Sequence, residues 1–383
     1  MIAWIVGTVL AVVQPGDADA GRAAEARFDS VTFQGIDQVY DLRFEEAERS
    51  FRELVRLRPG HPGGYFFLAM VDWWRMMIDL EDEQYDDRFV DALDNVIAMC
   101  DSMLDVNEED VTAIFFKGGS LGFQGRLMFH RNDYLGAANA GRKALPLVQA
   151  AAALEPHNYD IQLGTGIYNY YAEVIPNEYP MVKPLLLFIP AGDRKKGLEQ
   201  LNLAAEKGKF ASVEASYFLM QTYYFQEKEY AKALAIALRL NERFPNNMQF
   251  HRYVGRCYAA MADWPQAKRV FAEIAARARG GQRGYTGLIE REAAYYLGAA
   301  EMAGGDLNAA LAHFYRCDEL SRALDRKEPS GFMTMANLKI GTIYDAQSRR
   351  DLAIQQYQKV LSLKDYRGSH ALAEQYLKNP YSR

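Results

Sequence analysis

The amino-acid sequence predicts an all-α fold built from repeated helix pairs. The first observation is a recurring alanine, at Ala233, Ala267, Ala310 and Ala353, each followed four residues later by Ala237, Phe271, Phe314 or Tyr357. The second is composition: the chain has 13 prolines in 383 residues, and no alternation of apolar and polar residues typical of a strand is sustained. Long uninterrupted helices that pack at a fixed period are therefore expected.

The spacing of these alanines indicates the kind of repeat. The first step is 34 residues and the next two are 43 residues each. A period of 34 residues is that of the tetratricopeptide repeat, a pair of antiparallel helices. The chain thus resembles a tetratricopeptide-repeat protein, and the resemblance implies a right-handed α-α superhelix of about seven or eight helix pairs.

The repeat frame also predicts which residues pack the helices together. Two helices approach closely only where side chains are small, and large side chains fill the gaps between them. A tetratricopeptide unit accordingly takes a small residue at its eighth position, alanine at the twentieth and an aromatic residue at the twenty-fourth. The packing residues expected in the three C-terminal units are Gly255, Tyr258, Ala267 and Phe271, then Gly298, Ala310 and Phe314, then Gly341, Tyr344, Ala353 and Tyr357. A fourth unit surrounds Ala233, and a fifth holds Gly35, Ala47 and Phe51.

The rest of the chain divides around these units. Residues 28–160 are expected to form degenerate N-terminal repeats, with helices over 65–77, 88–104, 111–130 and 134–154. Residues 161–208 are expected to form an irregular helix pair with a proline-rich insert, and residues 211–383 C-terminal repeats that end in a capping helix over 369–377. The nine residues by which two steps exceed 34 are expected to lengthen either the loops between repeats or the adjoining helices.

The first twenty residues, 1–20, have the pattern of a secretory signal peptide. An apolar run over residues 2–13 is followed by Gln-Pro-Gly at 14–16 and by the small-x-small sequence Ala-Asp-Ala at 18–20. The run is shorter than the ~20 apolar residues that span a bilayer, and no basic residue precedes it. We expect cleavage near Gly21 and export to the bacterial periplasm or the periphery of the outer membrane. The alternative is an uncleaved N-terminal membrane anchor.

The central segment departs from the repeat pattern. It begins with Gly164, Gly166, Ile167 and Asn169, continues through four prolines between residues 176 and 190, and ends with Gly192, Asp193, Arg194, Gly197, Leu198 and Leu201. This order resembles the eukaryotic tetratricopeptide protein 39 family, which includes a fungal inclusion-body clearance protein. The resemblance covers about 40 residues. It implies a helical-repeat adaptor linked to organelle membranes and lipid storage, without an established enzyme activity.

The candidate groove and partner-binding residues lie in this segment, and they are Arg194, Asp193, Tyr168, Asn169 and Tyr171. In one interpretation, Arg194 faces an anionic ligand or the C-terminus of a partner. In the other, Asp193 caps the following helix and Arg194 pairs with a neighbouring carboxylate. The apolar run 185–189 is either a loop tucked into the groove or an exposed contact with lipid or a membrane surface.

Charge and motifs argue against nucleic-acid binding and against catalysis. Net charge is −6, with 44 basic and 50 acidic residues, whereas nucleic-acid binding relies on a basic surface. Ser120 lies in a G-x-S-x-G sequence, but its neighbours predict helix where a nucleophile elbow needs a strand. His313 and Cys317 are four residues apart, and two ligands make a poor metal site. We expect no catalytic residue, metal or cofactor, and we expect the three cysteines, Cys100, Cys257 and Cys317, to be small buried side chains.

The sequence therefore predicts a non-catalytic protein–protein interaction scaffold, exported, that assists the assembly or function of a cell-envelope complex. The first helix of each repeat would contribute to a concave surface that grips a protein or peptide partner. The alternative is a binding protein for a small amphipathic or lipidic ligand held in the concave groove, with the proline-rich centre as a lid.

Overall fold

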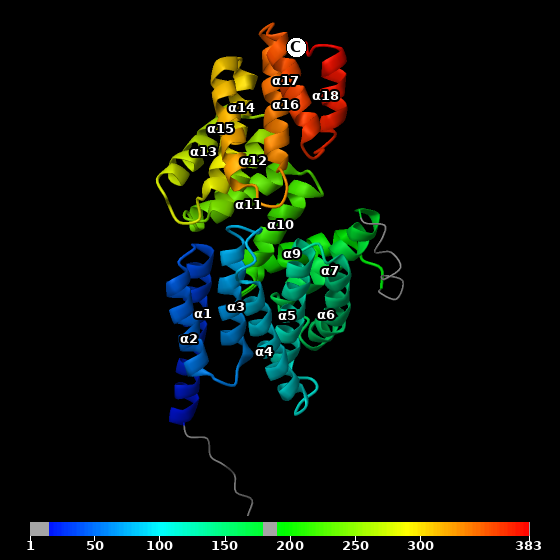
Figure 1. The fold of residues 1–383 in the computed structure, drawn as a ribbon. Helices are drawn as coiled ribbons and strands as arrows, with labels where there is room; N and C mark the ends of the chain where they lie inside the picture. Colours follow the sequence, from blue (N-terminus) through cyan, green and yellow to red (C-terminus); the bar gives the residue numbers. More distant parts are fainter. Residues whose placement is uncertain (1–14, 179–189, 383) are drawn as a thin grey trace, which may run out of the picture.

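The computed structural model describes residues 15–178 and 190–382. In these two ranges the chain forms α-helices and no strand, which confirms the predicted all-α repeat fold (Figure 1). The N-terminal half comprises α1 (Pro15–Tyr40), α2 (Phe44–Leu57), α3 (Pro62–Met76), α4 (Asp86–Leu104), α5 (Val111–His130), α6 (Tyr134–Leu154), α7 (Ile161–Glu178) and α9 (Arg194–Lys207). The C-terminal half comprises α10 (Ser212–Phe225), α11 (Tyr230–Arg243), α12 (Met248–Ala260), α13 (Trp264–Arg279), α14 (Gly287–Gly304), α15 (Leu307–Leu324), α16 (Gly331–Ala346), α17 (Arg350–Ser362) and α18 (Ser369–Lys378).

Consecutive helices pack as neighbours along the chain, and the first helices of successive pairs also meet one another. α1 contacts α3 and α3 contacts α5 in the N-terminal half, while α12 contacts α14 and α14 contacts α16 in the C-terminal half. Among the described helices, the second helices of successive pairs make no comparable contacts with one another. The first helices therefore line the inner side of the solenoid, as a helical-repeat fold requires.

The expected packing residues meet as the repeat frame predicts. A Cβ atom on Gly298 would stand 2.9 Å from the ring of Phe314, and one on Gly341 would stand 2.5 Å from the ring of Tyr357. Gly255 and Phe271 have the same relation, and so do Gly35 and Phe51 in the first repeat. The alanines at the twentieth position are fully buried, namely Ala47, Ala233, Ala267, Ala310 and Ala353.

The nine additional residues per step lengthen helices. α10, α11 and α12 have 14, 14 and 13 residues, whereas α13, α14 and α15 have 16, 18 and 18. The turn from Gly280 to Thr286, between α13 and α14, takes up part of the excess. The additional residues thus lengthen both the helices and a loop between repeats.

Helix α1 begins at Pro15, a residue suited to the first helical position because it has no N–H to leave unbonded. The small-x-small sequence at 18–20 lies within this helix, and residues 1–14 of the predicted signal peptide lie outside the described residues. Among the helices in 15–178 and 190–382, none combines the length and the apolar character needed to cross a bilayer.

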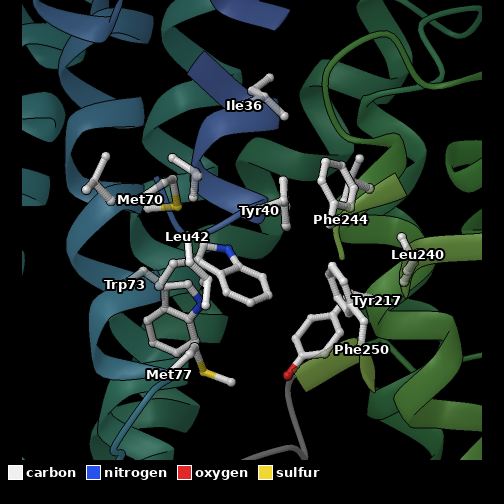
Figure 2. Close-up of a cluster of buried hydrophobic side chains, with 14 of the residues drawn as sticks. Ile36, Tyr40, Leu42, Met70, Trp73, Met77, Tyr217, Leu240, Phe244 and Phe250 are labelled. Atoms are coloured by element: carbon white, nitrogen blue, oxygen red, sulfur yellow. The ribbon is translucent and has the colours of Figure 1, made fainter. Parts of the chain in front are cut away.

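The two halves also pack against each other, which the sequence did not predict. The C-terminal ends of α1 and α3 meet α10, α11 and α12 through a buried cluster of aromatic side chains (Figure 2). The ring centroid of Trp74 lies 4.9 Å from that of Tyr40, 5.4 Å from that of Tyr217 and 5.9 Å from that of Phe250. Because these contacts join residues far apart in sequence, they fix the halves relative to each other.

Candidate functional site

The motif that interrupts the repeats forms a close crossing of α7 and α9. A Cβ atom on Gly197 would stand 2.5 Å from the backbone nitrogen of Tyr170 and 2.9 Å from the carbonyl oxygen of Gly166. A Cβ atom on Gly166 would in turn meet Leu201 at its backbone nitrogen, 3.0 Å away. The two helices therefore approach with their backbones in contact, and only glycine leaves room for this. Helix packing alone accounts for Gly166 and Gly197.

Asp193 and Arg194 have the structural roles that one interpretation predicted. The Asp193 carboxylate accepts a hydrogen bond from the backbone N–H of Lys196 at 2.9 Å and so caps α9. The Arg194 guanidinium pairs with Glu227, with Nε donating to Oε1 at 2.7 Å. Glu227 is largely buried and also accepts a hydrogen bond from the hydroxyl of Tyr170. The guanidinium holds the pKa of the Glu227 carboxyl below its usual value.

The other candidate residues of the motif also contact their own chain. Tyr168 donates a hydrogen bond from its hydroxyl to the carbonyl oxygen of Pro190. Asn169 donates from Nδ2 to Oε1 of Gln200 at 2.6 Å, across the α7–α9 crossing. Tyr171 is half-buried, with its ring 5.1 Å from that of Tyr170. The apolar run 185–189, predicted to be a lid or a membrane contact, lies outside the described residues.

The inner face of the N-terminal half is occupied by the chain's own helix α10. Arg126 of α5 ion-pairs with Glu214 of α10 at 2.6 Å, and the other carboxylate oxygen of Glu214 accepts from the hydroxyl of Tyr40 at 2.7 Å. The guanidinium carbon of Arg126 lies 4.7 Å from the ring centroid of Trp73 and 4.5 Å from that of Phe218. A positive charge enclosed by aromatic faces and one carboxylate is a stable arrangement. α10 therefore covers the inner face of this half around Arg126.

The connection that leads into α10 is held in the same face. The ring of Phe210 lies 5.1 Å from that of Phe33 on α1. The Asp160 carboxylate, at the start of α7, accepts hydrogen bonds from the backbone N–H groups of Phe210 and Ala211, each at 3.0 Å. Burial raises the pKa of the Asp160 carboxyl. A carboxylate from one helix pair thus satisfies free N–H groups at the start of another helix.

The inner face of the C-terminal half carries a partly buried charge cluster. Glu292 of α14 is 1% exposed and lies between Arg252 and Arg256 of α12. Arg256 donates from Nε to Oε1 at 2.5 Å and from Nη2 to Oε2 at 2.7 Å, and Arg252 donates from Nε to Oε2 at 2.8 Å. Burial acts to raise the pKa of the Glu292 carboxyl, but the two guanidinium groups outweigh it and hold that pKa at about 2.

Side chains that could suggest catalysis or metal binding are used in packing. Ser120 lies in the middle of α5 and is fully buried, so the G-x-S-x-G sequence forms no nucleophile elbow. The three cysteines are buried as predicted, and burial raises the pKa of each thiol to about 12. In the part of the chain that the structure describes, no group of three or more His, Cys, Asp or Glu side chains could hold a metal ion. A shallow surface hollow of about 850 Å³ lies over α15, lined by residues such as Tyr315, Arg316 and Arg322.

The motifs of the sequence do not indicate how charge is distributed between the two halves. Residues 1–208 hold 32 acidic and 19 basic side chains, and residues 209–383 hold 18 acidic and 25 basic ones, a net charge of −13 against +7. Exposed ion pairs join the two halves along the boundary between them, which we call the seam. In each of these pairs the N-terminal half supplies the acidic side chain and the C-terminal half the basic one. They are Asp29–Lys209, Asp37–Arg243, Glu45–Arg283, Asp79–Arg326 and Glu83–Lys327. A count of charges by half would have given this signal.

Comparisons with known proteins find helical-repeat structures. No family model matches the chain, and no curated protein matches it. The chain is similar to human IFIT1, solved as a dimer with m7Gppp-AAAA, at 13% identity over 92% of this chain and 85% of that one, with a TM-score of 0.45. It is similar to yeast Tom70 at 12% identity over 89% and 86%, with a TM-score of 0.39. A tetratricopeptide repeat protein from Parabacteroides merdae gives 13% over 92% and 98%, with a TM-score of 0.35. At these sequence identities and TM-scores, the similarities support no statement about function.

Proposed function

We propose that this protein is a non-catalytic scaffold that binds a protein partner through the C-terminal half of its solenoid. The observation that carries the proposal is the difference between the two inner faces. The N-terminal face is filled by the chain's own α10, through Glu214 and Phe218, and by Phe210 in the connection before it. The C-terminal face keeps the half-exposed ring of Phe225 on α10 and the guanidinium of Arg256 on α12, which is 16% exposed. Inner faces of helical-repeat proteins are extended surfaces suited to protein partners.

The chemistry of the described residues supports a binding role. The ionisable side chains that are most buried, such as Glu292, Asp318 and Asp345, are each engaged by basic partners. Ionisable side chains that are paired in this way hold helices together. Catalytic residues would instead include a nucleophile or a base that points into an accessible pocket.

The central motif fits the same role as a structural joint. The α7–α9 crossing holds these two helices together, and the Arg194–Glu227 pair links the start of α9 to the turn after α10. The kinship with the tetratricopeptide protein 39 family remains a prediction from this motif.

The experiment that tests the proposal is crosslinking of the full-length protein in its native cells, followed by identification of the adducts. The proposal predicts one reproducible protein adduct that disappears when the C-terminal inner face is altered. Native mass spectrometry of the purified protein tests the alternative function. A stoichiometric lipid or amphipathic small molecule with no protein adduct would overturn the scaffold proposal.

Export to the cell envelope is part of the proposal and rests on the pattern of residues 1–20. The measurement is the N-terminal sequence of the mature protein together with its location after cell fractionation. A mature chain that begins near Gly21 in the periplasmic fraction is expected. Retention of Met1 with recovery in the cytosol would contradict export and would leave the scaffold proposal standing.

A further inference from the structure

The turn between α13 and α14, residues 280–286, crosses the seam and packs on the turn between α1 and α2. Arg283 donates from Nη1 to the carbonyl oxygen of Leu42 at 3.3 Å and to the Glu45 carboxylate at 2.6 Å. A Cβ atom on Gly284 would stand 2.6 Å from Cδ1 of Leu42, so the backbone of the turn lies directly on that side chain. Leu42 is 1% exposed. The 280–286 turn therefore covers an apolar residue of the N-terminal half.

Tyr285 holds the other side of this turn to the C-terminal half. Its hydroxyl lies 2.9 Å from Nδ1 of His251, near the start of α12, and accepts a hydrogen bond from Nη1 of Arg277 at 3.2 Å. The ring centroids of Tyr285 and His251 are 6.0 Å apart, and both side chains are buried. The position of the turn on the seam thus depends on a contact with one buried imidazole.

These hydrogen bonds determine the protonation state of His251. Arginine only donates, so the Tyr285 oxygen accepts from Arg277. The hydroxyl proton is then left for Nδ1 of His251, which accepts it and leaves the ring proton on Nε2. A protonated imidazole has an N–H at both nitrogens and accepts no hydrogen bond. Proton uptake at His251 therefore breaks the bond from the Tyr285 hydroxyl.

The surroundings of the imidazole oppose proton uptake while the turn is closed. Helix α13 supplies one carboxylate, Glu273, whose Oε2 lies 3.8 Å from Nε2 of His251, and two guanidinium groups, Arg269 and Arg277. Glu273 already pairs with Arg277. Burial is the largest effect and lowers the pKa of His251 from 6.5 to about 4. The closed turn is therefore fully favoured above pH 6.5, and this preference is lost as pH falls from 6.5 to 4.

We propose that His251 is a proton-dependent switch of the seam, and that its protonation releases Tyr285 so that the 280–286 turn leaves the N-terminal half. Opening would expose Leu42 and Met248, two buried side chains that lie against the turn. This inference concerns contacts within the chain and is independent of the scaffold proposal.

The opening is local, because the aromatic cluster of the seam does not respond to acid. Its members around Trp74 are Tyr40, Tyr217 and Phe250. Burial raises the pKa of both tyrosines, so none of these four side chains titrates at acidic pH. The cluster therefore keeps the two halves together while the turn opens.

Hydrogen–deuterium exchange of the full-length protein tests the switch, at pH 7.5 and pH 5 with exchange times corrected for the intrinsic rate. The backbone N–H groups of Gln282 and Tyr285 report closure, because they donate to the carbonyl oxygens of Arg277 and Gln282. Their protection should fall about 25-fold between the two pH values, since the pKa of His251 changes from about 4 to 6.5 on opening. Protection in α16 should not change.

Three results of this measurement would overturn the proposal. The first is unchanged protection of the turn at pH 5. The second is exchange of the turn at the unprotected rate already at pH 7.5, since the turn would then not be held closed. The third is an equal loss of protection in α16, which would show global unfolding.

Oxidation of methionine by hydrogen peroxide gives a second readout that involves no backbone amide. Met248 is 0% exposed beside the turn and should be oxidised faster at pH 5 than at pH 7.5. Met220 on α10 is also 0% exposed and is the internal control, with the same rate at both pH values. Equal acceleration at both methionines would contradict a local opening.

Variants assign the effect to His251. His251→Gln keeps an acceptor for the Tyr285 hydroxyl but does not titrate, so its turn should have the same protection at both pH values. His313→Gln is the matched control and should follow wild type, because burial lowers the pKa of His313 as well but this residue lies on α15. The same pH dependence in His251→Gln and in wild type would rule out the switch.

Tyr285→Phe tests the hydroxyl independently, and circular dichroism checks that each variant is folded. This variant keeps the ring and removes the hydrogen bond to His251. The turn should therefore exchange about fivefold faster than in wild type at pH 7.5. An unchanged rate would show that the Tyr285 hydroxyl does not hold the turn closed, and the proposal would fail.

Discussion

The ring of Phe271 occupies the space that a side chain on Gly255 would need. A Cβ atom built on Gly255 would stand 2.8 Å from Cε2 and Cζ of Phe271, closer than two carbon atoms can approach without displacement. The two residues are 16 positions apart, one on each helix of the α12–α13 pair. The glycine of one helix and the aromatic ring of the other thus fix how closely the pair packs.

Gly255→Ala should therefore destabilise the protein although alanine favours helix. Overpacking of a filled core costs about 1–3 kcal/mol, and this exceeds the gain of about 0.5–1 kcal/mol that alanine gives in a helix interior. The control is Gly122→Ala in α5, where a Cβ atom would meet nothing within 4 Å. Urea unfolding should show a loss for the first variant and no loss for the second. Equal stability of both variants would show that the Gly255–Phe271 contact does not set the packing.

Low pH should lower the stability of the folded protein through the buried side chain of His251. Burial lowers the pKa of His251 from 6.5 to about 4, and its Nδ1 lies 2.9 Å from the hydroxyl of Tyr285. The unfolded chain takes up a proton at this side chain near pH 6.5, whereas the folded chain does not. The contribution to stability is therefore complete above pH 6.5 and is lost as pH falls from 6.5 to 4, at about 1.4 kcal/mol per pH unit.

The measurement is the melting temperature between pH 7.5 and pH 5 for wild type, His251→Gln and His157→Gln. His251→Gln should show a shallower decline with acid than wild type, because one titrating group is removed. His157 is exposed in the turn before α7, so the His157→Gln variant should follow wild type. The same decline in all three proteins would rule out His251 as a source of acid sensitivity.

The seam between the halves should respond to charge reversal and to salt. Arg283 and Glu45 lie 2.6 Å apart at the seam and are 55% and 58% exposed. Exposed pairs of this kind contribute ~0–1 kcal/mol. Glu45→Arg should therefore lower stability by at most about 1 kcal/mol, and the double variant Glu45→Arg with Arg283→Glu should restore it. The loss in the single variant should shrink in 1 M salt, where charges are screened beyond about 3 Å.

Thermal unfolding of the three proteins at low and high salt checks this prediction. If the double variant is no more stable than the single one, the polarity of the seam has no energetic role. The buried aromatic cluster would then hold the halves together alone.

Arg194→Ala should lower stability modestly. Glu227 would keep the hydrogen bond from Tyr170 but lose its guanidinium partner, and it would remain a largely buried carboxylate. Because Arg194 is itself about half exposed, the expected loss is about 1 kcal/mol. Unfolding in urea measures it, and Lys195→Ala on the same helix is the control. Unchanged stability with loss of partner binding would support the other interpretation, in which Arg194 contacts a ligand.

The sequence predicted the parts of the fold that depend on local spacing. Helices expected over 111–130 and 134–154 have those bounds in α5 and α6, and the capping helix expected over 369–377 is α18. These predictions succeeded because helix periodicity and the repeat frame act between neighbours in the chain. Asp193 as a helix cap succeeded for the same reason, since the cap and its partner Lys196 are three residues apart.

The packing of one half against the other could not be predicted in this way. Tyr40 and Glu214 are 174 residues apart, and nothing periodic connects them. The pairing of Arg252 with Glu292 spans 40 residues, which is close to one repeat, yet neither residue is part of the packing frame. Which charged side chains face each other across helices depends on the superhelix geometry, and the sequence pattern does not specify it.

Site-specific photo-crosslinking shows directly whether a protein partner binds the C-terminal inner face. A photoreactive amino acid replaces Phe225, half exposed beside the charge cluster, or Leu238, which is 43% exposed on α11. In living cells we expect one protein adduct from position 225, none from position 238, and loss of the adduct when Arg252→Gln is added. Equal adducts from both positions, or none from position 225, would contradict binding at this face.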